Sequence, residues 1–210
     1  VSENHLFNVL MSDIDRALKK FARNQESDPL EDLDAMIGLK EVKTKVSKIV
    51  KSIEAKTRML RIGREVEMPR LYILFLGNPG TGKTKVSDIF RRILQKIGFV
   101  KNSKYREIGA MDIKNANELE TIFNENKDGI IFIDEFHRMA EDQERQKALK
   151  WMVPQLTSPE FARTVVIGAG YTNEITKMLT NQDIDPGLDS RFKTDDRIMF
   201  EDYSRDEIGQ

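Results

Sequence analysis

The sequence predicts an α/β domain in which helices cover both faces of a parallel sheet. Short runs that are apolar throughout alternate with longer stretches that carry the 3.6-residue periodicity of amphipathic helices. Continuous apolar runs, as opposed to alternating ones, are typical of parallel strands buried on both faces. The chain has 210 residues, of which 39 % are apolar, and that is enough to build one substantial core. We therefore expect one α/β domain with a short N-terminal appendage.

The first 28 residues are expected to be this appendage, an amphipathic helix over about 4–21 followed by a polar linker at 24–29. The apolar residues of the helix recur at helical spacing: Leu6, Phe7, Leu10, Met11, Ile14, Leu18 and Phe21. A second helix is predicted over about 41–60. Its apolar face is formed by Val42, Val46, Ile49, Val50 and Ile53.

Five strands are expected in the remainder of the chain, at 71–76, 104–108, 130–133, 164–169 and 197–200. Helices are expected between them at 83–97 and 144–156. A further short helix begins after Asn115, which forms an N-cap pair with Glu118. This alternation of strands and helices predicts a five-stranded parallel sheet.

A phosphate-binding loop follows the first of these strands. Residues 77–84 read Gly-Asn-Pro-Gly-Thr-Gly-Lys-Thr and fit the pattern G-x-x-x-x-G-K-[ST]. Glycines let successive backbone N–H groups turn toward phosphate oxygens, and the helix that begins near Lys83 adds the positive end of its dipole. Lys83 can reach the β- and γ-phosphates, and Thr84 offers a hydroxyl to Mg²⁺. The alternative, a plain glycine turn, is disfavoured because a buried strand precedes the loop and an amphipathic helix follows it.

Two carboxylates end the strand expected at 130–133. Asp134 can serve the nucleotide-bound Mg²⁺, and Glu135 can orient or deprotonate the attacking water. Alone, such a pair is often a solvated strand end, but together with the phosphate loop it predicts ATP hydrolysis. A GTPase is disfavoured because the guanine-reading pattern N-K-x-D is absent, and residues 126–128 lack its spacer.

These motifs together resemble the AAA+ ATPases, and more narrowly the group that contains the red-type Rubisco activase of bacteria (CbbX-like) and stage V sporulation protein K. The resemblance covers about 33–210. Besides the phosphate loop, it is carried by LDAMIGL (33–39), FIDE (132–135), AGY (169–171), PGLDSRF (186–192) and FEDYS (200–204). It implies Mg²⁺-dependent ATP hydrolysis at the subunit interfaces of a homo-oligomeric ring that remodels or assembles a protein partner. In this family the ring is usually a hexamer, formed when the C-terminal lid is present.

The resemblance also assigns site residues. It places Ile37 and Gly38 at the adenine and makes Arg191 an arginine finger for the neighbouring subunit; from spacing alone, Arg191 would be a solvated arginine. The catalytic candidates are thus Lys83, Glu135 and Arg191. The nucleotide-binding candidates are Ile37, Gly38, Asn78, Pro79, Gly80, Thr81, Gly82, Lys83, Thr84, Lys85, Asp134 and Tyr171, with Thr84 and Asp134 as the Mg²⁺ ligands. The γ-phosphate sensor falls at Gly170 or Tyr171, or at Thr172 or Asn173 just after, and the resemblance does not choose among them.

Two features depart from the family pattern. The segment after Asp112 is short, and 113–117 carries no aromatic residue where CbbX-like proteins have an aromatic pore loop. This favours, as an alternative, an ATP-controlled assembly or switch module of a larger machine that does not thread its substrate. At the other end, residues 204–207 form a capping box that is expected to open an α-helical lid. The chain stops at 210 and starts with Val1, so we expect a part of a longer protein, divided at 1–28, 29–202 and 203–210.

Composition excludes several other classes. The 34 basic and 35 acidic residues nearly cancel, which makes a nucleic-acid-dependent ATPase the least favoured alternative. The absence of cysteine excludes disulfides and thiol chemistry, and the two histidines show no spacing for a zinc site.

His137 is interpreted as a satisfied structural histidine, with contact to a neighbouring subunit as the alternative. With no secretory signal and no apolar run that could span a bilayer, a cytoplasmic location is expected.

Overall fold

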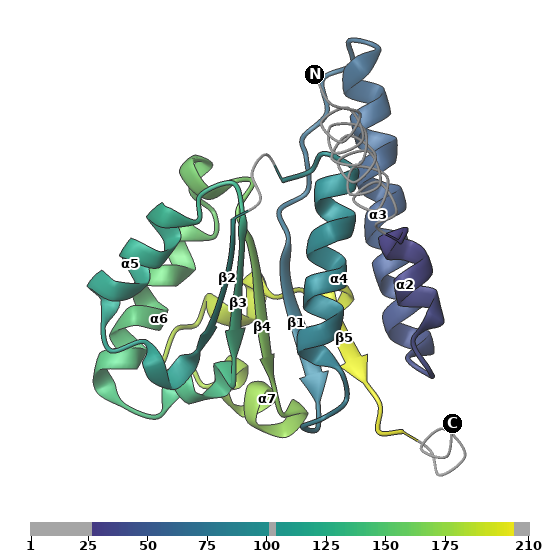
Figure 1. Ribbon diagram of the computed structural model, residues 1–210. Coiled ribbons are helices and arrows are strands. Elements are labelled where there is room, and N and C mark those ends of the chain that lie inside the picture. Colours follow the sequence, from purple (N-terminus) through teal and green to yellow (C-terminus); the bar gives the residue numbers. More distant parts are fainter. Residues whose placement is uncertain (1–26, 101–103, 204–210) are drawn as a thin grey trace, which may run out of the picture.

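The computed structural model describes residues 27–100 and 104–203, and Figure 1 shows a central sheet between two layers of helices. The strands are β1 (Tyr72–Gly77), β2 (Tyr105–Gly109), β3 (Ile130–Asp134), β4 (Val165–Gly170) and β5 (Arg197–Phe200). The α-helices are α2 (Pro29–Ala35), α3 (Lys40–Arg61), α4 (Lys83–Lys96), α5 (Ala116–Glu125), α6 (Gln143–Gln155), α7 (Thr172–Thr180) and α8 (Leu188–Arg191). Four 3₁₀ turns join them: η1 (Ala110–Asp112), η2 (Phe136–Ala140), η3 (Pro159–Phe161) and η4 (Thr194–Asp196).

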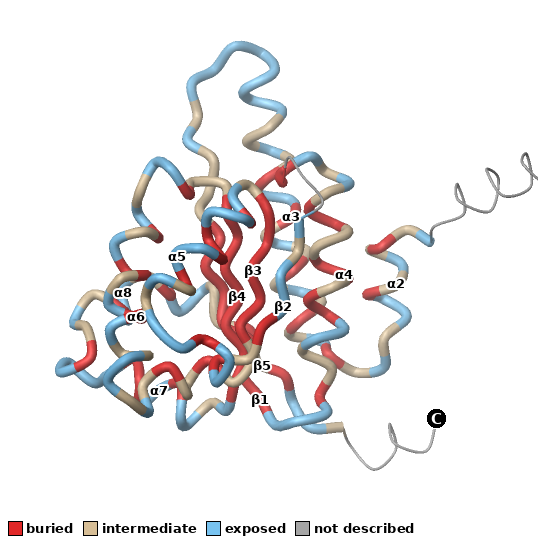
Figure 2. Tube along the Cα trace, turned by 60° about the vertical axis from the view of Figure 1, so that its left-hand side comes forward, coloured by how far each residue is buried: buried red, intermediate tan, exposed pale blue. Residues whose placement is uncertain are grey.

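The sheet confirms the predicted class. Its strand order is β2-β3-β4-β1-β5, and every pairing is parallel. Each of the five expected strands is present to within a residue or so of its expected ends. β1 and β4 are buried along their whole length, as their apolar sequences predict, and Figure 2 shows the strands as the buried centre of the molecule.

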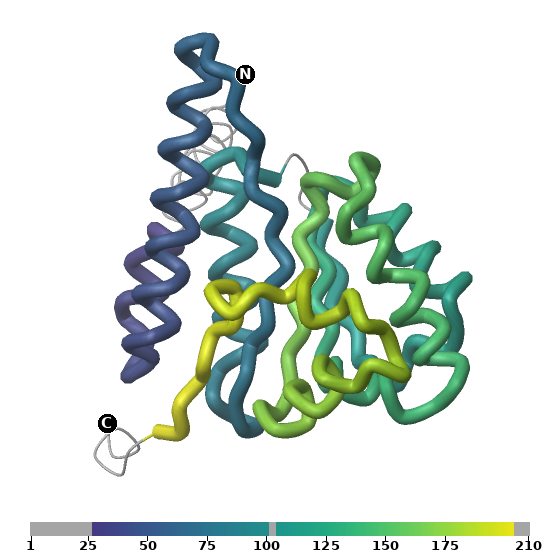
Figure 3. The backbone as a smooth tube through the Cα atoms, turned by 180° about the vertical axis from the view of Figure 1, so that it is seen from behind, coloured from purple at the N-terminus to yellow at the C-terminus, as the bar shows by residue number. Residues whose placement is uncertain are grey.

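Successive residues of each strand point to opposite faces of the sheet and so belong to two cores. On one face, Leu74 and Leu76 pack with α5, α6 and α7; on the other, Ile73 and Phe75 pack with α2, α3 and α4. Figure 3, seen from behind, shows the segment that leads from α7 to β5 crossing over the sheet toward α3. It thereby places β5 beside β1 as the edge strand of the sheet.

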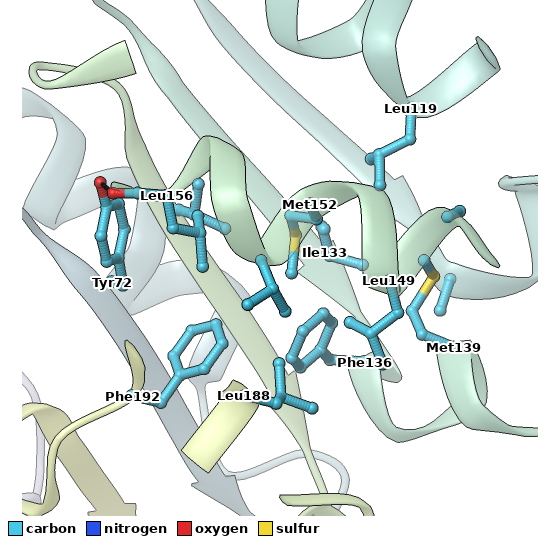
Figure 4. Close-up of a cluster of buried hydrophobic side chains, with 14 of the residues drawn as sticks. Tyr72, Leu119, Ile133, Phe136, Met139, Leu149, Met152, Leu156, Leu188 and Phe192 are labelled. Carbon is cyan, nitrogen blue, oxygen red and sulfur yellow. Dashed lines mark hydrogen bonds between the residues drawn. The ribbon is translucent and has the colours of Figure 1, made fainter. Parts of the chain in front are cut away.

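The first of these cores links segments that are far apart in the sequence. Phe136 of η2 and Phe192, just after α8, lie with ring centroids 5.6 Å apart, and Leu188 of α8 packs in the same cluster (Figure 4). All three side chains are fully buried. This core therefore fixes the turn after β3 and the helix that carries Arg191 against each other.

Some helices differ from the expectation. The helices expected at 41–60, 83–97 and 144–156 are confirmed as α3, α4 and α6, whereas α2, α7 and α8 were not predicted. The linker expected to run to residue 29 is shorter, because Pro29 is already the first residue of α2 and Asp28 caps it. Asn115 caps α5 as predicted. The helix expected at 4–21 and the capping box at 204–207 lie outside the described residues.

Candidate nucleotide-binding site

The carboxyl ends of β1, β3 and β4 meet at one edge of the sheet and border a cavity of about 400 Å³. In an open parallel sheet this edge is the usual place for a ligand. The cavity is lined by the phosphate loop (Gly77, Pro79, Gly80, Gly82, Lys83, Thr84 and Lys85), by Asp134, Glu135 and His137 after β3, and by Gly170 and Tyr171 after β4. Three separate predictions from the sequence are thus brought together in one place.

The conformation of the phosphate loop depends on backbone angles that glycine adopts readily. Gly80 and Gly82 adopt φ values of +77° and +92°, which favour glycine, and no side chain caps the start of α4. The first amides of α4 are therefore free to receive an anion. Thr81, by contrast, is buried and donates its hydroxyl to the carbonyl of Asn78 at 2.8 Å, so its side chain holds the loop together.

Lys83 lines the cavity, and its ammonium group is bound to the phosphate loop itself. Its Nζ donates to the carbonyl oxygens of Gly77 and Asn78 at 2.9 and 2.7 Å. Burial lowers the pKa of Lys83, while the nearby carboxylates of Asp134 and Asp202 act in the opposite direction. The ammonium group is thus partly desolvated and held only by neutral carbonyls, a state in which a phosphate is a strong competitor for it.

The acidic pair turns sharply at the end of β3. Asp134 accepts the N–H of Glu135 at 2.9 Å, and Glu135 has a left-handed φ of +51° at the start of η2. A left-handed conformation at a residue other than glycine is uncommon and is concentrated at functional sites. In this structure the Glu135 carboxylate lies 3.1 Å from Nε of Arg138. Asp134 and Glu135 both line the cavity.

The end of β4 contributes the backbone of Gly170, which has no side chain, and the aromatic ring of Tyr171 just after it. Gly170 and Tyr171 line the cavity, whereas Thr172 and Asn173 begin α7 and are not among the cavity residues. The Tyr171 ring lies against the His137 ring, with centroids 5.4 Å apart. Nδ1 of His137 is buried and has no hydrogen-bond partner among the residues that the structure describes. The interpretation of His137 as a satisfied structural histidine is therefore wrong, because the ring is placed by packing and not by hydrogen bonds.

The two adenine candidates lie in the turn between α2 and α3. Ile37 is 41 % exposed, and Gly38 has a φ of +66°. Neither lines the cavity, but Met36 of the same turn reaches the phosphate loop, where its Cε would lie 3.3 Å from a Cβ at Gly82. The turn between α2 and α3 thus runs beside the phosphate loop, and the apolar side chain of Ile37 is exposed in this turn.

Arg191 is separated from the cavity. It lies at the last residue of α8 and lines a second cleft, of about 590 Å³, together with Lys45 and Lys48 of α3 and Tyr72. Tyr72 is the first residue of β1, at the strand end opposite to the phosphate loop. The guanidinium donates to Ser190 Oγ at 3.1 Å, and its Nε is buried without a partner in residues 27–100 and 104–203. The structure does not bring Arg191 to the catalytic candidates of its own chain.

A protein-family model decides the classification: the model for the ATPase family associated with various cellular activities (AAA) matches residues 73–198. The chain belongs to the AAA family. The matched segment runs from β1 to β5 and contains every cavity residue, so the site described above belongs to an AAA ATPase domain.

Curated relatives of this AAA domain are found among secretion-system proteins. It is 32 % identical over 190 residues to the ESX-1 secretion system protein EccA1 of Mycobacterium leprae, with 84 % of this chain and 32 % of EccA1 aligned. It is 30 % identical over 189 residues to the ESX-2 secretion system protein EccA2 of Mycobacterium bovis, with 84 % and 30 % aligned. The chain therefore spans about a third of the length of these relatives.

Solved structures show the same fold. A mutant RuvB of Thermotoga maritima superposes with a TM-score of 0.60 at 20 % identity, covering 84 % of this chain and 50 % of that one. The AAA domain of FIGL-1 in complex with ADP superposes with a TM-score of 0.54 at 16 % identity, covering 81 % and 55 %. The P-loop AAA fold predicted from the sequence is thereby confirmed.

The structure adds two residues to this AAA site that the sequence analysis did not select. His137 lines the cavity, and Asp202 accepts both hydrogen bonds of the Asn78 amide, at 3.0 and 2.8 Å. Asp202 follows β5, so it ties the last strand to the phosphate loop. The sequence signal for Asp202 was its place after an apolar strand in a parallel sheet, the same signal that selected Asp134.

Replacing Gly77 with alanine is expected to destabilise this AAA domain. Gly77 pairs with Phe200 of β5, and a Cβ at Gly77 would lie 2.3 Å from the Phe200 carbonyl oxygen, a backbone atom that cannot move aside alone. We expect Gly77→Ala to lower the free energy of unfolding by about 3 kcal/mol, measured by urea denaturation. Gly63→Ala is the matched control, because Gly63 has a φ of +77° but nothing within 4 Å of a Cβ. It is expected to cost about 1 kcal/mol. Equal costs for both variants would contradict the prediction.

Proposed function

We propose that this AAA domain hydrolyses ATP with Mg²⁺ at a site that a second copy of the chain completes, and that the cycle remodels or assembles a protein partner. The observation that carries this proposal is the division of the catalytic candidates between two surfaces. Among the residues that the structure describes, the cavity is lined by Lys83 and Lys85 but by no arginine, whereas Arg191 lies in the separate cleft. A neighbouring subunit can bring the two together.

The cavity residues fit Mg²⁺ and a triphosphate. Mg²⁺ prefers oxygen ligands and is usually held by one or two protein groups together with substrate phosphates. Thr84 and Asp134 both line the cavity and supply such oxygens, and no group of three metal-ligating side chains is found within the described residues. When bound, Mg²⁺ would neutralise charge on the phosphates.

In the proposed mechanism the chain positions the substrate and moves a proton. The loop amides and Lys83 hold the phosphates, and Ile37 and Gly38 hold the adenine. Glu135 then takes a proton from the water that attacks the γ-phosphorus. Arg191 of the neighbouring subunit offsets the charge that develops on the transferred phosphoryl group. We also propose that copies of the chain form a ring, which is a hexamer when the C-terminal lid is present, and that the residues named above act at its subunit interfaces.

A protein is the partner that we favour. The curated relatives carry the names of secretion-system components, and the resemblance to the CbbX-like group also concerns an ATPase that acts on a protein. The nearly balanced charge disfavours nucleic acid. Residues 29–202 are proposed as the nucleotide-binding domain, between an N-terminal appendage at 1–28 and a lid that begins at 203. We propose a cytoplasmic site of action, where ATP is supplied. No helix in the described ranges has both the length and the apolarity needed to cross a membrane.

One observation favours the alternative of an ATP-controlled assembly module. The segment between η1 and α5, where a pore loop would project, is tied to the domain: Ile113 is fully buried, and Asn115 accepts the N–H of Glu118 at 3.0 Å. Met111, which lies in η1 just before this segment, is an exposed apolar residue, at 46 %. A ring with such short, fixed segments would change its shape without gripping a threaded chain.

The shared site is tested by the dependence of ATP turnover on protein concentration. If Arg191 acts on a neighbour, turnover per subunit is expected to rise with concentration until the assembly is saturated. Turnover that is independent of concentration, in a protein shown to remain monomeric, would contradict the proposal.

EDTA is expected to abolish turnover and added Mg²⁺ to restore it, and Lys83→Ala provides the control for contaminating ATPases.

A further inference from the structure

We infer that His137 reads the terminal phosphate of bound ATP and so lets the site distinguish ATP from ADP. The inference rests on the proposed function, because it concerns the same cavity. It adds a ligand contact at a residue that neither the phosphate-loop motif nor the acidic pair contains.

The first argument is position. His137 lies in η2, two residues after Glu135, and lines the cavity together with Lys83 and Asp134. Glu135 serves the water that attacks the γ-phosphorus, so this side of the cavity is where the terminal phosphate must lie. A donor on the same short turn as Glu135 is therefore well placed to contact that phosphate.

The second argument is the hydrogen bonding of the ring. Buried polar atoms are nearly always hydrogen-bonded, yet Nδ1 of His137 has no partner within the described part of the chain. No hydrogen bond to Nε2 is found there either, and Nε2 is not among the buried unpartnered atoms. Nε2 is thus accessible, on a residue that lines the cavity. Neither ring nitrogen therefore hydrogen-bonds to the described part of the protein, and Nε2 remains available to a ligand.

The third argument is the space at the end of β4. A Cβ at Gly170 would lie 2.8 Å from Nδ1 of His137 and 3.2 Å from Cδ1 of Ile175. The His137 ring therefore occupies the volume that a side chain at position 170 would fill. The Tyr171 ring also lies near the imidazole, with ring centroids 5.4 Å apart. Gly170, the last residue of β4, and Tyr171, the N-cap of α7, thus both lie beside the imidazole at the cavity wall.

Phosphate recognition follows from this placement. An Nε2–H group facing an anionic phosphate oxygen makes a charge-assisted hydrogen bond, which is about twice as strong as a neutral one. ADP lacks the γ-phosphate and cannot make this contact. The expected signature of His137 is therefore a change in ATP affinity without a change in ADP affinity.

The experiment measures the Kd of Mg-ATP and of Mg-ADP by titration calorimetry, with Glu135→Gln present in every protein so that ATP is not consumed. His137→Ala is expected to weaken ATP binding by about 10- to 100-fold and to leave ADP binding within about twofold. His137→Gln, which keeps a donor of similar reach, is expected to recover part of the loss. Glu141→Gln is the matched control, because Glu141 is an exposed residue just after η2 and does not line the cavity.

A double variant separates contact from packing. Gly170→Asn alone is expected to disturb the site, because its side chain meets the His137 ring. In His137→Ala/Gly170→Asn the same amide enters the vacated volume and is expected to restore part of the preference for ATP. Such recovery would support phosphate reading, since a loss of packing alone would affect both nucleotides equally.

The outcomes are distinguishable. Equal weakening of ATP and ADP in His137→Ala, or no change in either, would overturn this inference while leaving the proposed function intact. Failure of the parent protein to bind Mg-ATP, or binding that is indifferent to Lys83→Ala, would overturn the proposed function itself. Thermal unfolding of each variant confirms that the compared proteins are folded.

Discussion

Glu135→Gln is expected to stop ATP turnover and to leave ATP binding intact. The amide keeps the size of the side chain and can adopt the same left-handed backbone, but it cannot take a proton from water. Loss of a general base lowers rates by about 100- to 10,000-fold. The measurement is phosphate release at saturating ATP, with the Kd of ATP determined in parallel.

The controls for this variant follow from the structure. Glu135 pairs with Arg138 across a partly exposed contact, and such pairs contribute little to stability, so thermal unfolding is expected to change only slightly. Glu141→Gln removes an exposed carboxylate just after η2 and outside the cavity, and its turnover is expected to match the parent. Normal turnover in Glu135→Gln would remove Glu135 from the mechanism and leave the water to another group.

Arg191→Ala is expected to have the larger effect. An arginine that reaches the γ-phosphate in the transition state accelerates phosphoryl transfer by about 10³–10⁵-fold, so turnover is expected to fall by a factor in that range. Binding of ATP by an isolated subunit is expected to persist, because Arg191 does not line the cavity of its own chain. Lys193→Ala is the matched control: Lys193 is an exposed cation of the same cleft, and its loss is expected to change turnover by less than about twofold.

Mixing the two inactive variants tests whether the arginine acts between subunits. A subunit with Arg191→Ala keeps an intact Glu135, and a subunit with Glu135→Gln keeps an intact Arg191. Where the second subunit presents its arginine to the cavity of the first, one complete site forms and turnover is expected to reappear. No recovery in a mixture shown to co-assemble, or full turnover in Arg191→Ala alone, would contradict action in trans.

The sequence was sufficient for the sheet and for most of the cavity because both depend on local patterns. Short apolar runs such as that of β1 are typical of strands in a covered parallel sheet, and such a sheet brings the ends of β1, β3 and β4 to one edge. Lys83, Asp134 and Glu135 were found for this reason. Their roles in catalysis remain predictions that the variants above test.

The helices that the sequence analysis did not predict are short, and the position of His137 depends on residues that are distant in the sequence. α2 has only seven residues, and only Pro29 and Leu33 are buried in it, so no periodicity marks it. α7 did carry a signal, since its buried residues Ile175, Met178 and Leu179 follow helical spacing. The place of His137 could not be deduced, because it depends on the left-handed turn at Glu135 and on the missing side chain of Gly170.

The position of β1 in the sheet also bears on how the chain acquires its structure. Among the strands that the structure describes, β1 comes first in the sequence, yet its two neighbours in the sheet are the last two of them, β4 and β5. During synthesis at about 5–20 residues per second, β1 and the loop that follows it would wait roughly 6–25 s for β5 to emerge, about 120 residues later. Pairings of such long range also make folding slow, because the intervening chain must be ordered first. β1 therefore has no strand partner until β4 is made and lacks its second partner until β5 is made, and its unpaired apolar edges make the nascent chain prone to aggregation during this interval.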